Sequence, residues 1–286
     1  MSLTSEVKDV ARRAGADVVG IAAAARMDQA PQTAEELLPG AKALVVFGIR
    51  IPQAATKRWE VVKTPYHVYG HSVLNFKLSY IDYDVARFLE DAGYYALPFS
   101  SRDPHYDPDT FVTKGVSMRH AAAIAGLGEF GWNNLLLTPR FGPRIRFSAV
   151  LTDAPLEADP LYSGKPLCTK DKGCKRCIEA CPMDIFKTEE KTELEVEGKR
   201  FEMARLSTQA KQRCRWSEHG LIAEAGGRTN IRPPEVITTQ DYLEAGARMD
   251  PVQKGRSGIF GGIYYCGRCV HSCPVGDNRA RPARSN

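Results

Sequence analysis

The N-terminal half of the chain alternates between helical and strand-like hydrophobic patterns. Residues 71–92 carry apolar side chains every three or four positions, which predicts an amphipathic helix that ends at Gly93. A continuous apolar run at 41–51, between Gly40 and Pro52, predicts a buried strand. We expect further helices at 5–14, 34–38 and 119–126, strands at 16–22 and 94–99, and two strands joined by a turn within 135–153. Alternation of this kind predicts an α/β (α+β) fold.

The pattern changes after residue 152. Residues 153–167 are rich in Pro, Asp and Gly, which is typical of a linker, and a cysteine-bearing segment begins at Cys168. Residues 183–265 interrupt that segment with a charged, hairpin-like stretch and glycine-rich loops. We therefore expect an α/β domain over 1–155 and a second domain over 156–286, with 183–265 as an insertion in it.

Composition indicates a globular protein and leaves the partner open. The chain has 286 residues, of which 43% are hydrophobic and 26% charged, and its net charge of +5 is spread along the sequence. That charge permits an anionic partner without requiring one, and no concentrated basic face favours nucleic acid. The N-terminal segment is amphipathic and charged, so we expect no export signal and a cytoplasmic location, and no apolar run is long enough to cross a membrane.

Eight cysteines carry the strongest signal in the sequence. A cytosolic protein keeps its thiols reduced, so disulfides are not expected. CKRCIEACP at 174–182 and CGRCVHSCP at 266–274 share the spacing Cys-x2-Cys-x3-Cys-Pro, the core of the bacterial ferredoxin motif, in which the last cysteine ligates the other cluster. This crossing rule predicts two 4Fe-4S clusters. The first would be held by Cys168, Cys174, Cys177 and Cys273, and the second by Cys214, Cys266, Cys269 and Cys181.

Two alternatives to this assignment remain open. Paired CxxC motifs also suit tetrahedral zinc, although the third cysteine and its proline have no function in a zinc ribbon. Cys214 could be a free buried thiol, which would leave the second cluster one sulfur short. The first motif also departs from ferredoxins, because five residues, TKDKG, separate Cys168 from Cys174 where two are usual. A loop of this composition can extend outward and leave the ligand in place.

The segment 125–159 resembles a known superfamily. Its AGLGEFG, LTPRFGPRIR and LTDAPLEAD stretches, followed by two cysteine motifs, are similar to those of the corrinoid-dependent iron–sulfur reductases, which include epoxyqueuosine reductases and reductive dehalogenases. The resemblance covers roughly residues 60–286. It implies a nitroreductase-like core that binds base-off cobalamin, followed by a ferredoxin-like domain with two 4Fe-4S clusters that pass electrons inward to cobalt.

The resemblance also implies candidate site residues. Tyr66 and Tyr69 lie where substrate-side residues are expected and could donate a proton, and Arg119 keeps the position of an arginine of the epoxyqueuosine reductases. The alternatives are a solvated loop for the tyrosines and a surface ion pair for Arg119. Trp132 is a candidate corrin contact or a core residue. The other candidate cofactor contacts are His71, Gly126, Gly128, Asn134, Thr138, Arg140, Gly142 and Arg144.

Two departures from the family bear on activity. Epoxyqueuosine reductases carry an acidic residue before the AGLG turn, and the corresponding position here falls at about Val112. The segment 103–108, DPHYDP, nearly matches a motif that ligates cobalt through histidine, but Pro108 stands where glycine belongs.

Our leading hypothesis is a two-cluster iron–sulfur reductase that uses a corrinoid for reductive dehalogenation or deoxygenation of a small molecule. Its expected partner is an electron-donor protein such as a ferredoxin or a flavodoxin. One rival is a tRNA epoxyqueuosine reductase, which the missing acid disfavours. The other rival is a non-catalytic electron carrier or corrinoid activator, which would not need 150 residues of α/β domain.

Overall fold

A four-stranded sheet forms the centre of the N-terminal half. The computed structural model describes residues 2–27, 32–62, 64–99, 115–227, 229–249 and 266–276. The sheet contains β1 (Val18–Ala23), β2 (Ala43–Arg50), β3 (Ala96–Phe99) and β6 (Ile145–Thr152), in the order β1-β2-β6-β3, and every neighbouring pair is antiparallel. All of β2 except Arg50 is buried, as its continuous apolar run predicts, because both faces of the sheet are covered.

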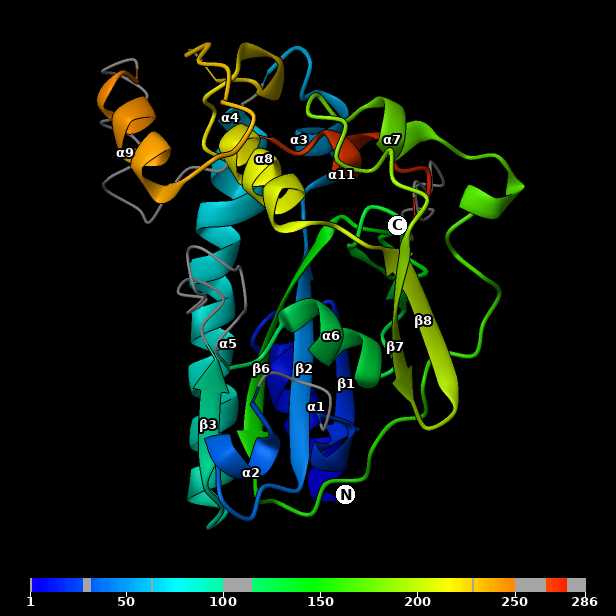
Figure 1. The fold of residues 1–286 in the computed structure, drawn as a ribbon. Coiled ribbons are helices and arrows are strands. Elements are labelled where there is room, and N and C mark those ends of the chain that lie inside the picture. Colours follow the sequence, from blue (N-terminus) through cyan, green and yellow to red (C-terminus); the bar gives the residue numbers. More distant parts are fainter. Residues whose placement is uncertain are drawn as a thin grey trace, which may run out of the picture.

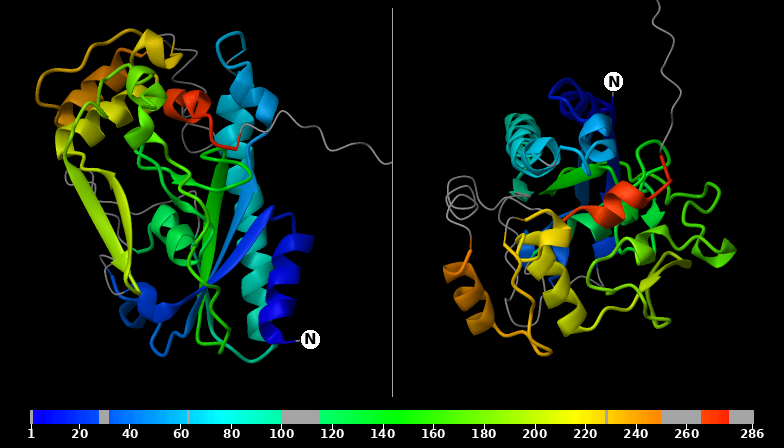
Figure 2. Two further views of the ribbon diagram at one scale, coloured as in Figure 1. Left: turned by 90° about the vertical axis from the view of Figure 1, so that its right-hand side faces the viewer. Right: turned by 90° about the horizontal axis from the view of Figure 1, so that it is seen from above.

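Helices pack on both faces of this sheet (Figures 1 and 2). On one face, α1 (Leu3–Arg13) and α5 (Val73–Asp91) bury Val7, Leu78 and Ile81 against inward-facing strand residues. On the opposite face, α6 (Met118–Ile124) packs its alanines against the other side chains of β2 and β6. Helix α5 has the predicted apolar face and ends just before Gly93, whose φ of 88° suits a C-cap glycine.

The remaining N-terminal elements are short. They are η1 (Ala24–Met27), α2 (Ala34–Leu37), α3 (Gln53–Lys57), α4 (Thr64–His67), the π-helical turn η2 (Val68–Ser72), β4 (Glu129–Phe130) and β5 (Leu136–Leu137). The two strands expected within 135–153 are present, but they belong to different sheets. Strand β5 pairs with β4, whereas β6 pairs with β2 and β3, so the turn between them joins two sheets.

The predicted linker is attached to the N-terminal core. Residues 155–163 form no helix or strand, as expected, but Asp159 binds the edge of the sheet. One of its carboxylate oxygens accepts a hydrogen bond from the Ile21 N–H at 2.8 Å, and the other pairs with Lys8 at 2.6 Å. Arg26 donates to the Asp159 carbonyl at 2.8 Å. The linker is therefore attached to β1 at Asp159, nine residues before Cys168.

The predicted insertion 183–265 also packs in part on the N-terminal core. Its described elements are β7 (Lys191–Val196), β8 (Lys199–Ala204), α8 (Thr208–Glu218), η4 (Ala223–Ala225) and α9 (Thr239–Ala247). Leu194 and Phe201 of the hairpin join the same buried cluster as α6. The boundary at 155–156 stays a prediction, since buried side chains from both sides of it share one core.

The cysteine-bearing segments gather at one end of the sheet (Figure 1). These segments include η3 (Lys170–Lys172), α7 (Arg176–Glu179) and α11 (Arg268–Ser272). Among the helices described, none is both long and apolar enough to span a bilayer. Val112 and the 103–108 motif lie outside the described residues.

Candidate functional site: two groups of cysteines

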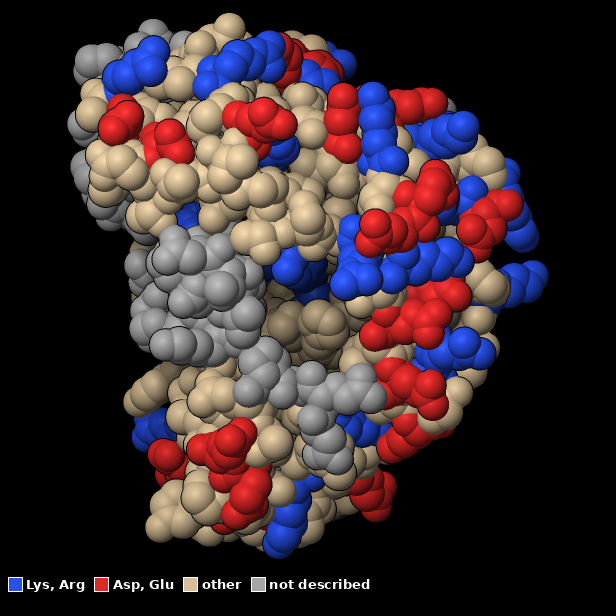
Figure 3. Space-filling model, viewed as in Figure 1, with Lys and Arg blue, Asp and Glu red and all other residues tan. Residues whose placement is uncertain are grey.

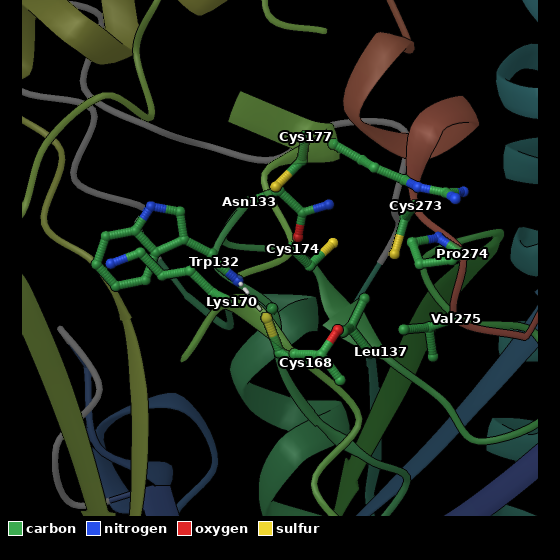
Figure 4. Close-up of a pocket in the computed structure, with 13 residues that line it drawn as sticks. Trp132, Asn133, Leu137, Cys168, Lys170, Cys174, Cys177, Cys273, Pro274 and Val275 are labelled. Atoms are coloured by element: carbon green, nitrogen blue, oxygen red, sulfur yellow. Dashed lines mark hydrogen bonds between the residues drawn. The ribbon is translucent and has the colours of Figure 1, made fainter. Parts of the chain in front are cut away.

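Four cysteines drawn from both motifs lie around one pocket. Cys168 precedes η3, Cys174 follows it, Cys177 lies in α7 and Cys273 follows the last residue of α11. Figure 4 shows their sulfur atoms around a shared space. Burial, followed by the charges of nearby cysteines, raises the pKa of the Cys177 thiol to about 12. The contributing neighbours are Cys168, Cys273 and Cys174.

The other four cysteines form a second group. Burial raises the pKa of Cys214 well above its ordinary value, and the charge of Glu218 adds to that effect. Cys266, Cys269 and Cys181 act on Cys214 in the same direction, which means that they lie within electrostatic reach of it. The structure therefore brings the first four cysteines around one pocket and the other four near one another, while their assignment as ligands of two clusters stays a prediction.

An apolar layer lies beside both groups. Trp132, Ile185 and Phe186 pack against cysteines of the first group, among them Cys168 and Cys177, and of the second, among them Cys214. This contact covers part of both groups, whose cysteines are all half-buried. Within the described ranges, no three His, Cys, Asp or Glu side chains converge closely enough to hold a single metal ion.

The unusual five-residue spacing is accommodated by a turn. The η3 turn ends at Gly173, whose φ of 89° is readily adopted by glycine, and the chain then reverses to bring Cys174 next to Cys168. The ammonium group of Lys170 lies over the Trp132 ring, 3.6 Å from its centre, and the backbone N–H of Trp132 donates to Cys168 Sγ at 3.4 Å. Trp132 is 6% exposed, so it belongs to the core and supports the pocket wall.

The LTPRFGPR turn contacts the C-terminal cysteine motif. Arg144 is buried, and its Nη1 donates to the carbonyls of Val270 at 3.3 Å and of Cys273 at 2.9 Å, while its Nη2 donates to the carbonyl of Val275. A Cβ on Gly142 would lie 2.0 Å from the Val275 oxygen. Gly142 and Arg144 thus contact the protein's own backbone, and the corrin contact expected of them stays a prediction.

The remaining glycines of the family motif also face backbone. A Cβ on Gly126 would lie 2.1 Å from the Pro160 carbonyl oxygen, and one on Gly128 would lie 2.0 Å from that of Leu137. Thr138 is 1% exposed and forms a bridge with Gly142. The close approach predicted at these positions exists on the side of protein backbone, and the corrin contacts expected of Gly126, Gly128 and Thr138 stay predictions.

The tyrosines of the predicted site differ in accessibility. Tyr66 is 1% exposed, and burial is the main cause that raises its pKa. Its ring lies under Gly267, where an added Cβ would come within 2.4 Å of it. Tyr69, in the π-helical turn, is 52% exposed, while His71 is buried and shares a hydrogen bond of 2.9 Å with Arg146. Of the two tyrosines, only Tyr69 is open to a solute.

Arg119 and a carboxylate that we did not predict lie near the second group. The Arg119 guanidinium donates to the Asn134 carbonyl, and Asn134 adopts a φ of 56°. Burial raises the pKa of Glu218, and the charges of Arg146, Arg215 and Arg119 oppose that rise. Glu218 follows Cys214 by four residues on α8, so the two share a helix face. That spacing was the available sequence signal.

A hollow opens near the middle of one face of the molecule, with basic side chains at its upper edge (Figure 3). Arg140, another predicted contact, is exposed, and its guanidinium lies 5.1 Å from the ring centre of Phe141. The catalytic and corrin-binding functions of Tyr69, Arg119, Asn134, Arg140 and His71 stay predictions.

Comparisons with curated proteins support the superfamily. No family model matches the chain. It is 38% identical over 111 residues to a tetrachloroethene reductive dehalogenase of Desulfitobacterium hafniense, and this match covers 38% of the chain and 17% of that protein. It is 26% identical over 156 residues to an epoxyqueuosine reductase of Bacillus cereus, which covers 51% of the chain and 36% of that protein. The matches thus span well under half of either relative.

Solved structures share the fold. An epoxyqueuosine reductase bound to a tRNA stem loop superposes with a TM-score of 0.55 at 18% identity, over 98% of this chain and 67% of that one. A reductive dehalogenase described as B12-dependent gives a TM-score of 0.53 at 16% identity, and the match covers 93% of this chain and 37% of that one. The solved structures confirm the mixed α/β fold, and the chain is similar in sequence to reductive dehalogenases and to an epoxyqueuosine reductase. Both kinds of relative are reductases.

Proposed function

We propose that this protein is an iron–sulfur reductase that holds two 4Fe-4S clusters. One observation carries the proposal: Cys174 and Cys177 of the first motif and Cys273 of the second line one pocket together with Cys168, and the other four cysteines lie near one another. Thiolates arranged in this way are the ligand set of a two-cluster ferredoxin. Such clusters would supply one-electron transfer.

The first group offers the ligand set of one cluster. Its four thiols line one shared space, and four thiolates are what a cubane requires. The backbone N–H of Trp132 donates to Cys168 Sγ, and hydrogen bonds to cluster sulfurs tune reduction potentials. The apolar layer of Trp132, Ile185 and Phe186 would exclude water from the ligands.

The corrinoid part of the proposal rests on the relatives. The B12-dependent dehalogenase shares the fold, and the hollow in Figure 3 offers a concave surface for a large ligand. Several residues first expected to contact the corrin are engaged with protein backbone instead. Among the predicted contacts, Arg119, Arg140 and Tyr69 are exposed and are the candidates for holding a corrinoid. When bound, it would supply a low-valent cobalt centre for reductive cleavage of a carbon–halogen or carbon–oxygen bond.

Electrons would enter from a donor protein at the first group. Between residues 165 and 178 the chain carries five Lys or Arg residues and a single acid, Asp171. Lys170 and Arg176 line the pocket, and Lys172 and Lys175 are exposed beside it. This charge distribution suits an acidic donor such as a ferredoxin or a flavodoxin.

Anaerobic reconstitution with iron and sulfide tests the proposal. We expect about eight iron and eight sulfide per chain, as two Cys₄ cubanes require. Added cob(II)alamin should give an EPR signal without nitrogen splitting if no protein histidine ligates cobalt. About two zinc ions and no sulfide would overturn the cluster proposal. Full clusters with no corrinoid binding would instead favour an electron carrier.

The same preparation separates the two enzymatic branches. Conversion of epoxyqueuosine in tRNA by the corrinoid-loaded protein would favour the alternative function. Dehalogenation of a halogenated organic compound, with no such conversion, would favour the leading one.

A further inference from the structure

Cys273 needs an anchor that its own motif does not supply. Helix α11 begins next to Cys266 and ends at Ser272, so it carries Cys273 away from Cys266 and Cys269 and into the first group. The last carbonyls of a helix have no partner within that helix. Something outside the motif must therefore hold the segment that follows α11.

Arg144 supplies that anchor. Its guanidinium donates to the carbonyls of Val270, Cys273 and Val275, which bracket the cysteine on both sides. The side chain is 5% exposed, and a guanidinium is the one side chain that offers five donors in a rigid planar arrangement. Its own backbone is fixed as well, because the Ile51 N–H donates to the Arg144 carbonyl at 2.9 Å.

The backbone near Arg144 fits the same segment. A Cβ on Gly276 would lie 2.2 Å from the Gly142 nitrogen, just as one on Gly142 would meet Val275. Two glycines therefore let the turn and the C-terminal segment touch at backbone distance. Figure 4 shows Pro274 and Val275 along the wall of the pocket, next to the Cys273 sulfur.

We propose that Arg144 is the positioning residue that places Cys273 in the first group. Through this residue the N-terminal core supplies the support that lets Cys273 of the second motif join Cys168, Cys174 and Cys177 as the fourth ligand. The inference rests on the proposed function for the statement that a cluster forms there. Arg144 acts through backbone carbonyls and touches no substrate, so its loss removes one ligand from one cluster.

Iron and sulfide content test this proposal in the reconstituted full-length protein. In Arg144→Gln, the iron content should fall from about eight to about four per chain, and the EPR spectrum of the cluster held by the Cys214 group should remain. Cys273→Ser should give the same spectrum, because both variants lose the same ligand. Arg140→Gln is the matched control, since that exposed guanidinium lies over the Phe141 ring in the same turn, and this variant should keep about eight iron. Full iron and both signals in Arg144→Gln would overturn the proposal.

Thiol alkylation tests the positioning without any cluster. In iron-free full-length protein, Cys273 and Cys174 are alkylated in one sample and their rates are compared by mass spectrometry. Arg144→Lys keeps the charge but not the planar set of donors, so Cys273 should react roughly tenfold faster relative to Cys174 than in the wild type. An unchanged ratio would contradict the assignment. Because this measurement needs no iron, it judges Arg144 even if the wild type binds no cluster.

Discussion

Single residues of the family motif act on distant parts of this chain. The cysteine grouping could be predicted because a local spacing rule carries it. The partners of Arg144 could not, since they lie 126 to 131 residues away along the sequence. The same holds for Gly126 and Gly128, whose close approach was predicted although the approaching group was not. The residue type indicates which kind of contact a position can make, whereas only the fold identifies the partner in that contact.

Asp82 is a buried acid whose ionisation opposes folding. It is 3% exposed, and burial raises its pKa to about 8, against a partial offset from the Ser148 hydroxyl. Below about pH 4 the carboxyl is neutral in both the folded and the unfolded state, so its ionisation costs no stability. As pH rises toward about 8 the unfolded state ionises first, and the stability that the neutral carboxyl allows is lost. Asp82→Asn should therefore be more stable than the wild type above about pH 8, with the difference narrowing in acid.

Urea unfolding at several pH values measures this effect. Asp84→Asn, an exposed change on the same helix, is the control and should follow the wild-type profile. Identical pH profiles for Asp82→Asn and the wild type would show that Asp82 does not carry the dependence.

The two predicted tyrosines should behave differently. Tyr69 is open to solvent, so as a proton donor its change to Phe should lower turnover by about two to four powers of ten once a substrate is known. Tyr66→Phe keeps the ring that packs under Gly267 and should leave turnover nearly unchanged. The comparison uses turnover at equal iron and corrinoid content. Full activity in Tyr69→Phe would remove Tyr69 from the mechanism.

Among elements, the strongly patterned ones were predictable. Strand β2 and helix α5 appear within a few residues of their expected bounds, because a continuous apolar run and a single apolar face leave few alternatives. Helices α8 and α9 were not predicted, since they are short and carry few apolar residues. Sheet membership of β5 and β6 also could not be inferred, because a turn between two strands does not say whether they pair.

The β7–β8 hairpin should stabilise the N-terminal core. Phe201 is 2% exposed and packs in the same cluster as α6. Phe201→Ala should therefore lower the free energy of unfolding by about 3–5 kcal/mol. Arg200→Ala, on the exposed face of the same strand, is the control and should change it by less than about 1 kcal/mol. Chemical denaturation of both variants measures the difference, and equal losses would mean that the hairpin packs more loosely than described.

At the scale of the whole molecule, cysteines and cationic side chains gather at the same end of the sheet. The cysteine groups lie at one end, and the first of them is bordered by exposed cationic residues. The net charge of +5 did not indicate this, because oppositely charged residues elsewhere mask a local excess. The sequence around the TKDKG insertion has the excess, but only the fold brings it to the rim of a cysteine-lined pocket.

That local excess predicts a salt-dependent reaction with an acidic electron donor. Lys172→Glu combined with Lys175→Glu reverses two exposed charges beside the pocket, so reduction of the clusters by a reduced acidic ferredoxin at low salt should slow by about tenfold or more. The difference from the wild type should shrink as salt is added, because screening weakens the attraction. Lys77→Glu combined with Arg87→Glu makes the same change in net charge on exposed positions of α5 and should leave the rate unaltered. Anaerobic stopped-flow absorbance gives the rates, and complete reduction by dithionite in every variant shows that the clusters are intact. An equal loss in both double variants would mean that only net charge matters, and no loss in the first would place the docking site elsewhere.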